Sequence, residues 1–165
     1  MSTLEHIKRM LLSASKDLYY ISESEESFEF VYFPNVFHLP STALEFASEV
    51  SGRDVSILEQ KSEQENWPQP QVIEFDEFFA NLIKNEDEVS ETTMNSNSNY
   101  RALQESFYRA FVNDDNGNSK EPILKENPKV YRVPREYSGT RVDIYIVGLF
   151  EGVGVAGLKT LSIES

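Results

Sequence analysis

The chain has 165 residues, of which 39% are hydrophobic and 12% aromatic, enough apolar surface for one folded domain and too much for a disordered chain. Its 28 acidic and 15 basic residues give a net charge of −13, which repels nucleic-acid phosphates, so we expect no direct nucleic-acid binding. The absence of cysteine excludes disulfides and thiolate chemistry, and no apolar run is long enough to enter a membrane, which predicts a cytoplasmic protein.

Two helices and a strand are predicted in the first third of the chain. Apolar residues recur at helical spacing over residues 2–18, which indicates an amphipathic helix. The aromatic run over residues 28–33 ends at Pro34 and is typical of a strand. Thr42 and Glu45 have the spacing of a capping box and predict a second helix.

The middle of the chain alternates between short regular elements and polar segments. Residues 71–75 predict a short strand, and Asp76 is placed to cap a helix that follows it. The acidic and then Ser/Asn-rich residues 85–99 have little apolar surface, and we expect a mobile loop there. Helical periodicity resumes over residues 100–112.

The C-terminal part of the chain contains three β-rich runs separated by turn-forming residues. These runs are "NPKVYRV", "TRVDIYIVGLF" and "GVAGLKTLSI", and their order predicts consecutive antiparallel pairing. We expect Lys159 at a solvated edge of this sheet. The element order predicts one α+β domain over residues 1–165, with a mixed, largely antiparallel sheet covered by helices.

Glycines at positions 148, 152, 154 and 157 lie within and between the last two runs. None of these glycines is directly followed by a Lys-Ser/Thr pair, and no helical pattern follows them, so a phosphate-binding loop is disfavoured. A hairpin turn and close packing between strands explain these glycines better.

The stretch "SESEESFEF" concentrates Glu23, Glu25 and Glu26 just before the first predicted strand. Three such carboxylates could form a metal site, a catalytic pair, a phosphate mimic or a solvated turn. His6 and His38 are far apart and lack metal-ligand spacing, so we expect neither a metal site nor a cofactor. No Ser-His-Asp pattern or nucleophile elbow occurs, and we do not expect an enzyme.

Four segments carry a resemblance to a known family: "YYISESEESFEFVYF", "VIEFDEFF", "NPKVYRV" and "VDIYIVGLFEGVGVAGLKTLSIES". In this order the chain resembles the NuiA family of inhibitors of sugar-non-specific nucleases. The resemblance implies a three-layer α-β-α sandwich similar to the pathogenesis-related-1 fold. It also implies a non-catalytic function, in which the protein blocks the active site of a Mg²⁺-dependent DNA/RNA nuclease.

The resemblance also implies which residues bind the partner. By motif, Glu23 corresponds to the acidic residue that meets a phosphate-binding arginine of the nuclease, and Ser165 to the C-terminal residue that approaches its catalytic metal. Glu25, Glu26 and Glu164 lie beside these two positions and are expected at the same interface. The alternative is an acidic interaction module of the same fold with a different basic protein partner.

Overall fold

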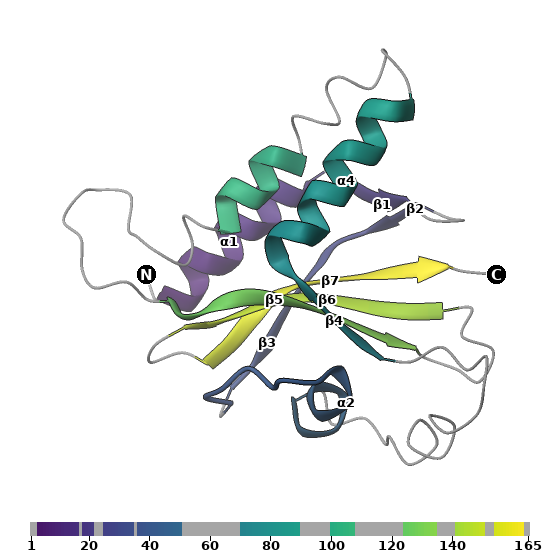
Figure 1. The fold of residues 1–165 in the computed structure, drawn as a ribbon. Helices are drawn as coiled ribbons and strands as arrows, with labels where there is room; N and C mark the ends of the chain where they lie inside the picture. The colour runs from purple at the N-terminus through teal and green to yellow at the C-terminus, as the bar shows by residue number, and fades with distance from the viewer. Residues whose placement is uncertain are drawn as a thin grey trace, which may run out of the picture.

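In a computed structural model, the described residues are 3–16, 18–21, 25–34, 36–50, 70–89, 100–107, 124–134, 141–150 and 154–163. A helical segment is formed by residues 100–107. The other elements are α1 (Thr3–Ser15), β1 (Tyr19–Ile21), β2 (Glu25–Ser27), β3 (Glu29–Phe33), α2 (Ala43–Glu45), the π-helical turn η1 (Phe46–Val50), β4 (Gln71–Glu74), α4 (Phe75–Val89), β5 (Leu124–Pro134), β6 (Arg141–Phe150) and β7 (Gly154–Ile163) (Figure 1).

Five strands form one antiparallel sheet in the order β3-β7-β6-β5-β4. The predicted meander of the last three runs is confirmed, because β5 pairs with β6 and β6 pairs with β7. Helices and an antiparallel sheet together place the chain in the α+β class. The prediction of a mixed sheet is wrong for the described strands, which contain no parallel pair.

Strand β6 is buried along nearly its whole length because helices cover both faces of the sheet (Figure 1). Its residues alternate between two cores: Ile144 and Ile146 face α1 and α4, whereas Tyr145 and Val147 face α2 and η1. Side chains of a strand point to opposite faces in turn, so burial on both faces requires an unbroken apolar run. The run "IYIV" within β6 meets that requirement.

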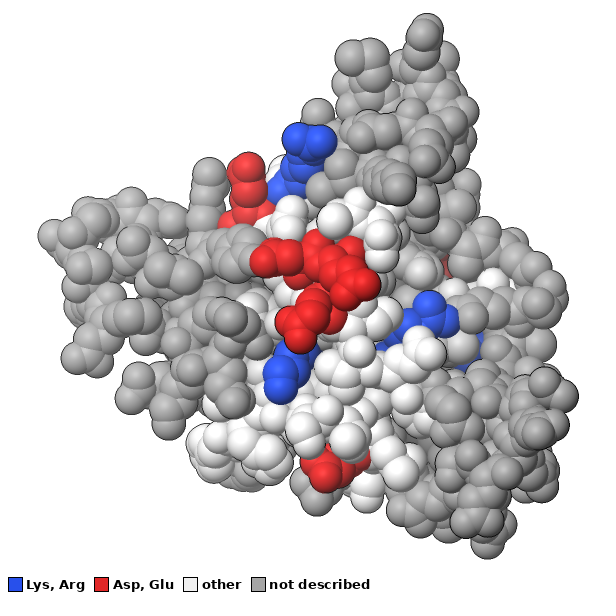
Figure 2. Space-filling model, viewed as in Figure 1, with Lys and Arg blue, Asp and Glu red and all other residues white. Residues whose placement is uncertain are grey.

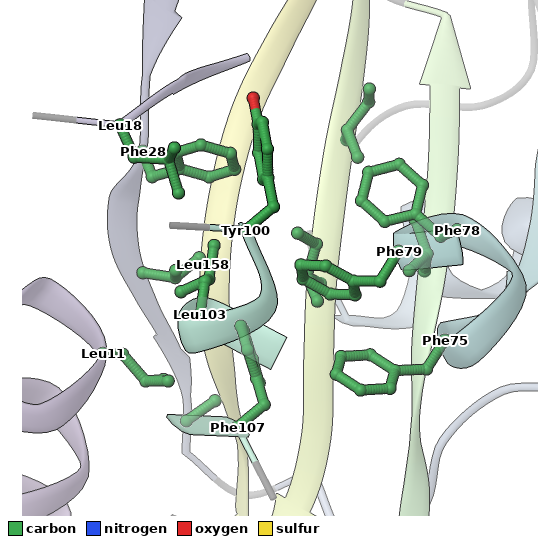
Figure 3. Close-up of a cluster of buried hydrophobic side chains, with 14 of the residues drawn as sticks. Leu11, Leu18, Phe28, Phe75, Phe78, Phe79, Tyr100, Leu103, Phe107 and Leu158 are labelled. Carbon is green, nitrogen blue, oxygen red and sulfur yellow. The ribbon is translucent and has the colours of Figure 1, made fainter. Parts of the chain in front are cut away.

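The larger core lies between the sheet and the helices α1, α4 and 100–107 (Figure 3). Its centre is aromatic: the ring of Phe75 lies 4.8 Å from that of Phe79 and 5.4 Å from that of Phe107, measured between centroids. Each of these three helices supplies fully buried side chains, among them Leu11 and Leu103. The helical periodicity predicted at the start of the chain and from residue 100 is confirmed for α1 and for residues 100–107, and residues 108–112 lie outside the described residues.

The smaller core lies on the opposite face and centres on Phe46. Its ring stacks on Tyr131 at 4.2 Å between centroids, and the Tyr131 hydroxyl donates a 2.7 Å hydrogen bond to the Pro40 carbonyl. Thr42 caps α2 as predicted, because its side-chain oxygen accepts a 3.1 Å hydrogen bond from the Glu45 amide.

Helix α4 differs from the predicted element at both ends. It begins at Phe75, so Asp76 lies in its first turn and is not its cap. It continues through Val89, and residues 85–89, expected to belong to a loop, are helical. Adding a turn to an existing helix costs little free energy, and glutamate is a good helix former. The polar residues 85–89 can therefore extend the helix that the apolar residues before them have already formed. Residues 90–99 lie outside the described residues.

Two glycines of β7 have the roles predicted for them. Gly154, at the start of the strand, has φ of 120°, a conformation that L side chains rarely adopt. Gly157 lies where β6 approaches most closely: a Cβ there would overlap the Ile146 carbonyl oxygen and lie 2.8 Å from the Val147 Cα. The contact is with backbone, so no rotamer change could relieve it.

The substitution Gly157→Ala should therefore destabilise the domain by about 1 to 3 kcal/mol, the usual cost of forcing atoms into a packed interior. Urea unfolding followed by circular dichroism measures this change. Arg101→Ala, at an exposed helical position, is the control and should change the free energy of unfolding by less than about 0.5 kcal/mol. Equal midpoints for Gly157→Ala and the parent protein would contradict the close approach of the two strands.

Candidate functional site

The glutamate-rich segment forms a small hairpin that the sequence analysis missed. Strand β1 pairs antiparallel with β2, with Tyr19 opposite Ser27 and Ile21 opposite Glu25. No strand was predicted before residue 28, where the first predicted strand begins. The available signal was the β-forming run "YYI", followed after a short polar interval by residues able to pair with it.

Strand β2 is attached to the last strand of the sheet by a buried threonine. The Thr160 hydroxyl lies 3.0 Å from the Ser27 carbonyl oxygen and 3.4 Å from that of Glu26, and it donates to both. The neighbouring strand β3 pairs with β7 from Phe33–Val155 to Glu29–Lys159. Residues that precede Glu29 therefore approach the residues that follow Lys159.

A cleft of about 210 Å³ opens between β2, β3 and the C-terminal half of β7. We call it the β2–β7 cleft. It is lined by Glu26, Ser27, Glu29, Asp143, Lys159, Thr160 and Leu161.

The Lys159 ammonium lies between two carboxylates of the β2–β7 cleft, those of Asp143 and Glu29. Its Nζ lies 3.9 Å from Oδ1 of Asp143 and 3.8 Å from Oε1 of Glu29, and 5.5 Å from the centroid of the Tyr145 ring. The Asp143 side chain is 0% exposed, whereas that of Glu29 is 69% exposed. Water screens a contact with an exposed carboxylate more than one with a buried carboxylate, so we expect the ammonium to interact more strongly with Asp143 than with Glu29.

Lys159 itself is not at a solvated edge, contrary to expectation. Strand β7 lies between β3 and β6, and the Lys159 side chain is only 23% exposed. Its aliphatic stem is covered while the ammonium reaches the cleft. Asp143 was not singled out either, although a charged residue within an otherwise apolar strand run was a signal that it needs a partner.

The structure brings one predicted site residue into this cleft, which is Glu26. Glu25 lies in β2, and its side chain is outside the described part of the structure. Glu23, Glu164 and Ser165 lie outside the described residues; in the sequence, Glu164 directly follows Ile163, the last residue of β7.

The described side chains that line the β2–β7 cleft carry a net negative charge. Three carboxylates, of Glu26, Glu29 and Asp143, face one ammonium. Among the described residues, no group of three or more His, Cys, Asp or Glu side chains could hold a metal ion. No described helix has the length and apolar character needed to span a membrane.

A second acidic surface, also missed from the sequence, lies where β4 passes into α4. Figure 2 shows acidic side chains gathered at the centre of this face. The exposed acids of the two elements are Glu74, Asp76 and Glu77, and Gln104 donates a 3.2 Å hydrogen bond to the Asp76 carboxylate. Strand β4 is at the opposite edge of the sheet from β3, so this surface is separate from the β2–β7 cleft.

No protein-family model and no curated protein matches the sequence. The resemblance to the NuiA family therefore stays an interpretation of the four motifs quoted above.

A double-mutant cycle should show that Lys159 is coupled more strongly to Asp143 than to Glu29. We expect Lys159→Met to lower the free energy of unfolding by about 1 to 3 kcal/mol, because it removes an ammonium that lies 3.9 Å from a fully buried carboxylate. In the cycle with Asp143→Asn, the coupling should be about 0.5 to 3 kcal/mol.

The matched cycle uses Glu29→Gln, which removes the exposed partner of the same ammonium. Its coupling should stay below about 0.5 kcal/mol. Both cycles are measured by urea unfolding at neutral pH. Equal coupling energies would show that burial of Asp143 does not strengthen its interaction with Lys159.

Proposed function

We propose that this protein is an inhibitor of a Mg²⁺-dependent, sugar-non-specific DNA/RNA nuclease. In this proposal the protein is not an enzyme and acts in the cytoplasm. Glu23 enters the nuclease active site as a phosphate mimic, and Ser165 at the chain end approaches the catalytic metal. Glu25, Glu26 and Glu164 contribute to the same interface.

The single observation that carries the proposal is the attachment of β2 to β7. An inhibitor of this kind must present Glu23 and Ser165 to one cleft of the nuclease. Glu23 precedes β2 by two positions in the sequence, and Ser165 follows β7 by two. The Thr160 hydrogen bonds hold these two strands together. The described strands next to these two positions, β2 of the two-stranded sheet and β7 of the five-stranded sheet, are therefore in contact although they are distant in sequence.

The charge of the β2–β7 cleft supports the same function. A nuclease active site is built from cations and a metal that bind phosphate, so a carboxylate held by a rigid scaffold is an anion that the enzyme cannot hydrolyse. The carboxylates of Glu26, Glu29 and Asp143 outnumber the ammonium of Lys159. The net charge of −13 adds attraction toward a basic cleft, which mainly raises the association rate.

The arrangement of helices also agrees with the fold that the resemblance implies. Helices α1 and α4 lie on one face of the sheet and α2 on the other (Figure 1). We therefore include in the proposal a three-layer α-β-α sandwich similar to the pathogenesis-related-1 fold.

The second candidate function is an acidic interaction module that binds a different basic protein. The surface of Glu74, Asp76 and Glu77 favours it, because this surface lies across the sheet from β2 and β7. Titration of a nuclease of the kind that NuiA inhibitors block separates the two functions. Inhibition should be complete near a one-to-one ratio, whereas full cleavage of DNA at micromolar excess would favour the module.

Among the glutamates of the motif, Glu23 should matter most for inhibition. We expect Glu23→Ala to weaken binding to the nuclease by about 2 to 5 kcal/mol, because it would leave a buried arginine of the nuclease unpaired. Glu25→Ala and Glu26→Ala should cost less and act mainly on the association rate. The inhibition constant and its dependence on salt are the measurements.

The matched control for this series is Glu77→Ala, which removes an exposed carboxylate of the second acidic surface. It should leave the inhibition constant nearly unchanged. Small and equal losses for all four variants, abolished by high salt, would rule out a specific phosphate mimic at Glu23.

Changes at the chain end should impair inhibition without unfolding the domain. Mg²⁺ binds oxygen ligands at short distances and in fixed geometry, so a peptide that continues beyond Ser165 cannot take the place of a terminal carboxylate. We expect removal of Glu164 and Ser165, or a C-terminal tag, to raise the inhibition constant about tenfold or more. The melting temperature should stay the same, because both residues follow β7. If both the truncated and the tagged protein inhibited as well as the parent protein, Ser165 would be excluded from the interface.

A further inference from the structure

A second and larger pocket lies beside α1, on the other side of the β2–β3 junction from the β2–β7 cleft. Its volume is about 590 Å³, within the range of about 300 to 1,000 Å³ typical of small-molecule sites. Ser27 lines both this pocket and the β2–β7 cleft. We call it the α1 pocket.

The apolar wall of the α1 pocket comes from α1 and the residues that follow it. Leu18 and Phe28 are buried members of the larger core, and Leu12 is 36% exposed, one of the few large apolar side chains so exposed among the described residues. The Ser15 hydroxyl, also in the lining, donates a 2.8 Å hydrogen bond to the Leu11 carbonyl within the helix. The pocket therefore offers a hydrophobic surface that an apolar group can cover.

Among the described residues that line the same pocket, three are cations, Lys8, Arg9 and Lys16, and one is a carboxylate, Glu5. The Lys8 ammonium lies 5.9 Å from the centroid of the Phe30 ring. Within the described part of the chain, no ion pair links Lys8, Arg9 or Lys16 to a carboxylate.

This local excess of positive charge runs against the composition of the chain, in which acidic residues outnumber basic ones by 28 to 15. A lysine near the end of a helix complements the helix dipole, which accounts for Lys16 alone. It does not account for a cationic rim around an apolar recess. Cations beside a hydrophobic wall are the features that bind an organic anion with an apolar body.

We propose that the α1 pocket binds a small amphipathic anion, a carboxylate or sulfonate carried on an aromatic or short aliphatic group. The apolar body covers Leu12, Leu18 and Phe28, and the anionic group lies among the cations of Lys8, Arg9 and Lys16. This site is independent of the proposed nuclease inhibition, because it uses none of the predicted partner-binding residues.

The test uses naphthoate as the probe and naphthalenemethanol as its neutral counterpart. Amide chemical shifts of the full chain are followed as each compound is added. Naphthoate should bind saturably at up to millimolar concentration and shift the amides of Leu12, Lys16 and Phe28 most. The alcohol should bind about fivefold to tenfold more weakly, the difference expected from the loss of contacts with exposed cations.

The double variant Arg9→Gln/Lys16→Gln should bind naphthoate about fivefold to tenfold more weakly than the parent protein does. Its affinity for the alcohol should be unchanged. Both positions are exposed, so the fold should be retained, which the melting temperature checks. The matched control is Arg101→Gln/Lys129→Gln, which removes two charges outside the α1 pocket. It should leave binding of naphthoate unchanged.

Three results would overturn the proposal. The first is no saturable shift with naphthoate, and the second is equal affinity for the acid and the alcohol, which would indicate an apolar patch without anion recognition. The third is binding of a glutamate-rich peptide or of phosphatidylglycerol vesicles, but not of naphthoate, at the same amides. That result would assign the surface to an acidic protein segment or an anionic membrane.

Discussion

Burial of the central strands on both faces is the constraint on which the rest of the molecule depends. A slip of β6 by one residue would exchange the sets of side chains in the two cores, so double-sided packing fixes the register of its neighbours. It also leaves no solvent for a polar side chain in the middle of the sheet. Asp143 is fully buried and lies 3.9 Å from the Lys159 ammonium, and both residues line the β2–β7 cleft.

Patterns that depend on nearby residues were predictable from the sequence. The run "GVAGLKTLSI" coincides with β7, and Thr42 caps α2, because turn residues, alternation and capping spacing are all local signals. The β1–β2 hairpin had only the weak signal of the run "YYI", since strands of three residues have little stability of their own and rely on contacts such as those of Thr160. The Asp143–Lys159 pair was missed for a related reason: it arises from the register of β6 on β7, in which Asp143 is opposite Leu161 and Lys159 is opposite Tyr145.

The two pockets on either side of the β2–β3 junction have opposite character. Carboxylates predominate in the β2–β7 cleft, whereas cations predominate in the α1 pocket, and Ser27 lines both. The two pockets therefore present different charges to a partner although they share a lining residue. A field that changes sign over so short a distance orients a charged partner as well as attracting it.

The pairing of β3 with β7 has a consequence for the synthesis of the protein. Strand β3 is made early and β7 late, yet they are neighbours in the sheet, and β7 also separates β3 from β6. Contacts between parts of the chain so distant in sequence form slowly, because a long loop must close first. While the chain is still on the ribosome, β3 has no neighbour in this sheet, and its aromatic residues Phe30 and Tyr32 lack the core they later join. The sheet can therefore be completed only after translation has passed β7, and the growing chain depends until then on other means of avoiding aggregation.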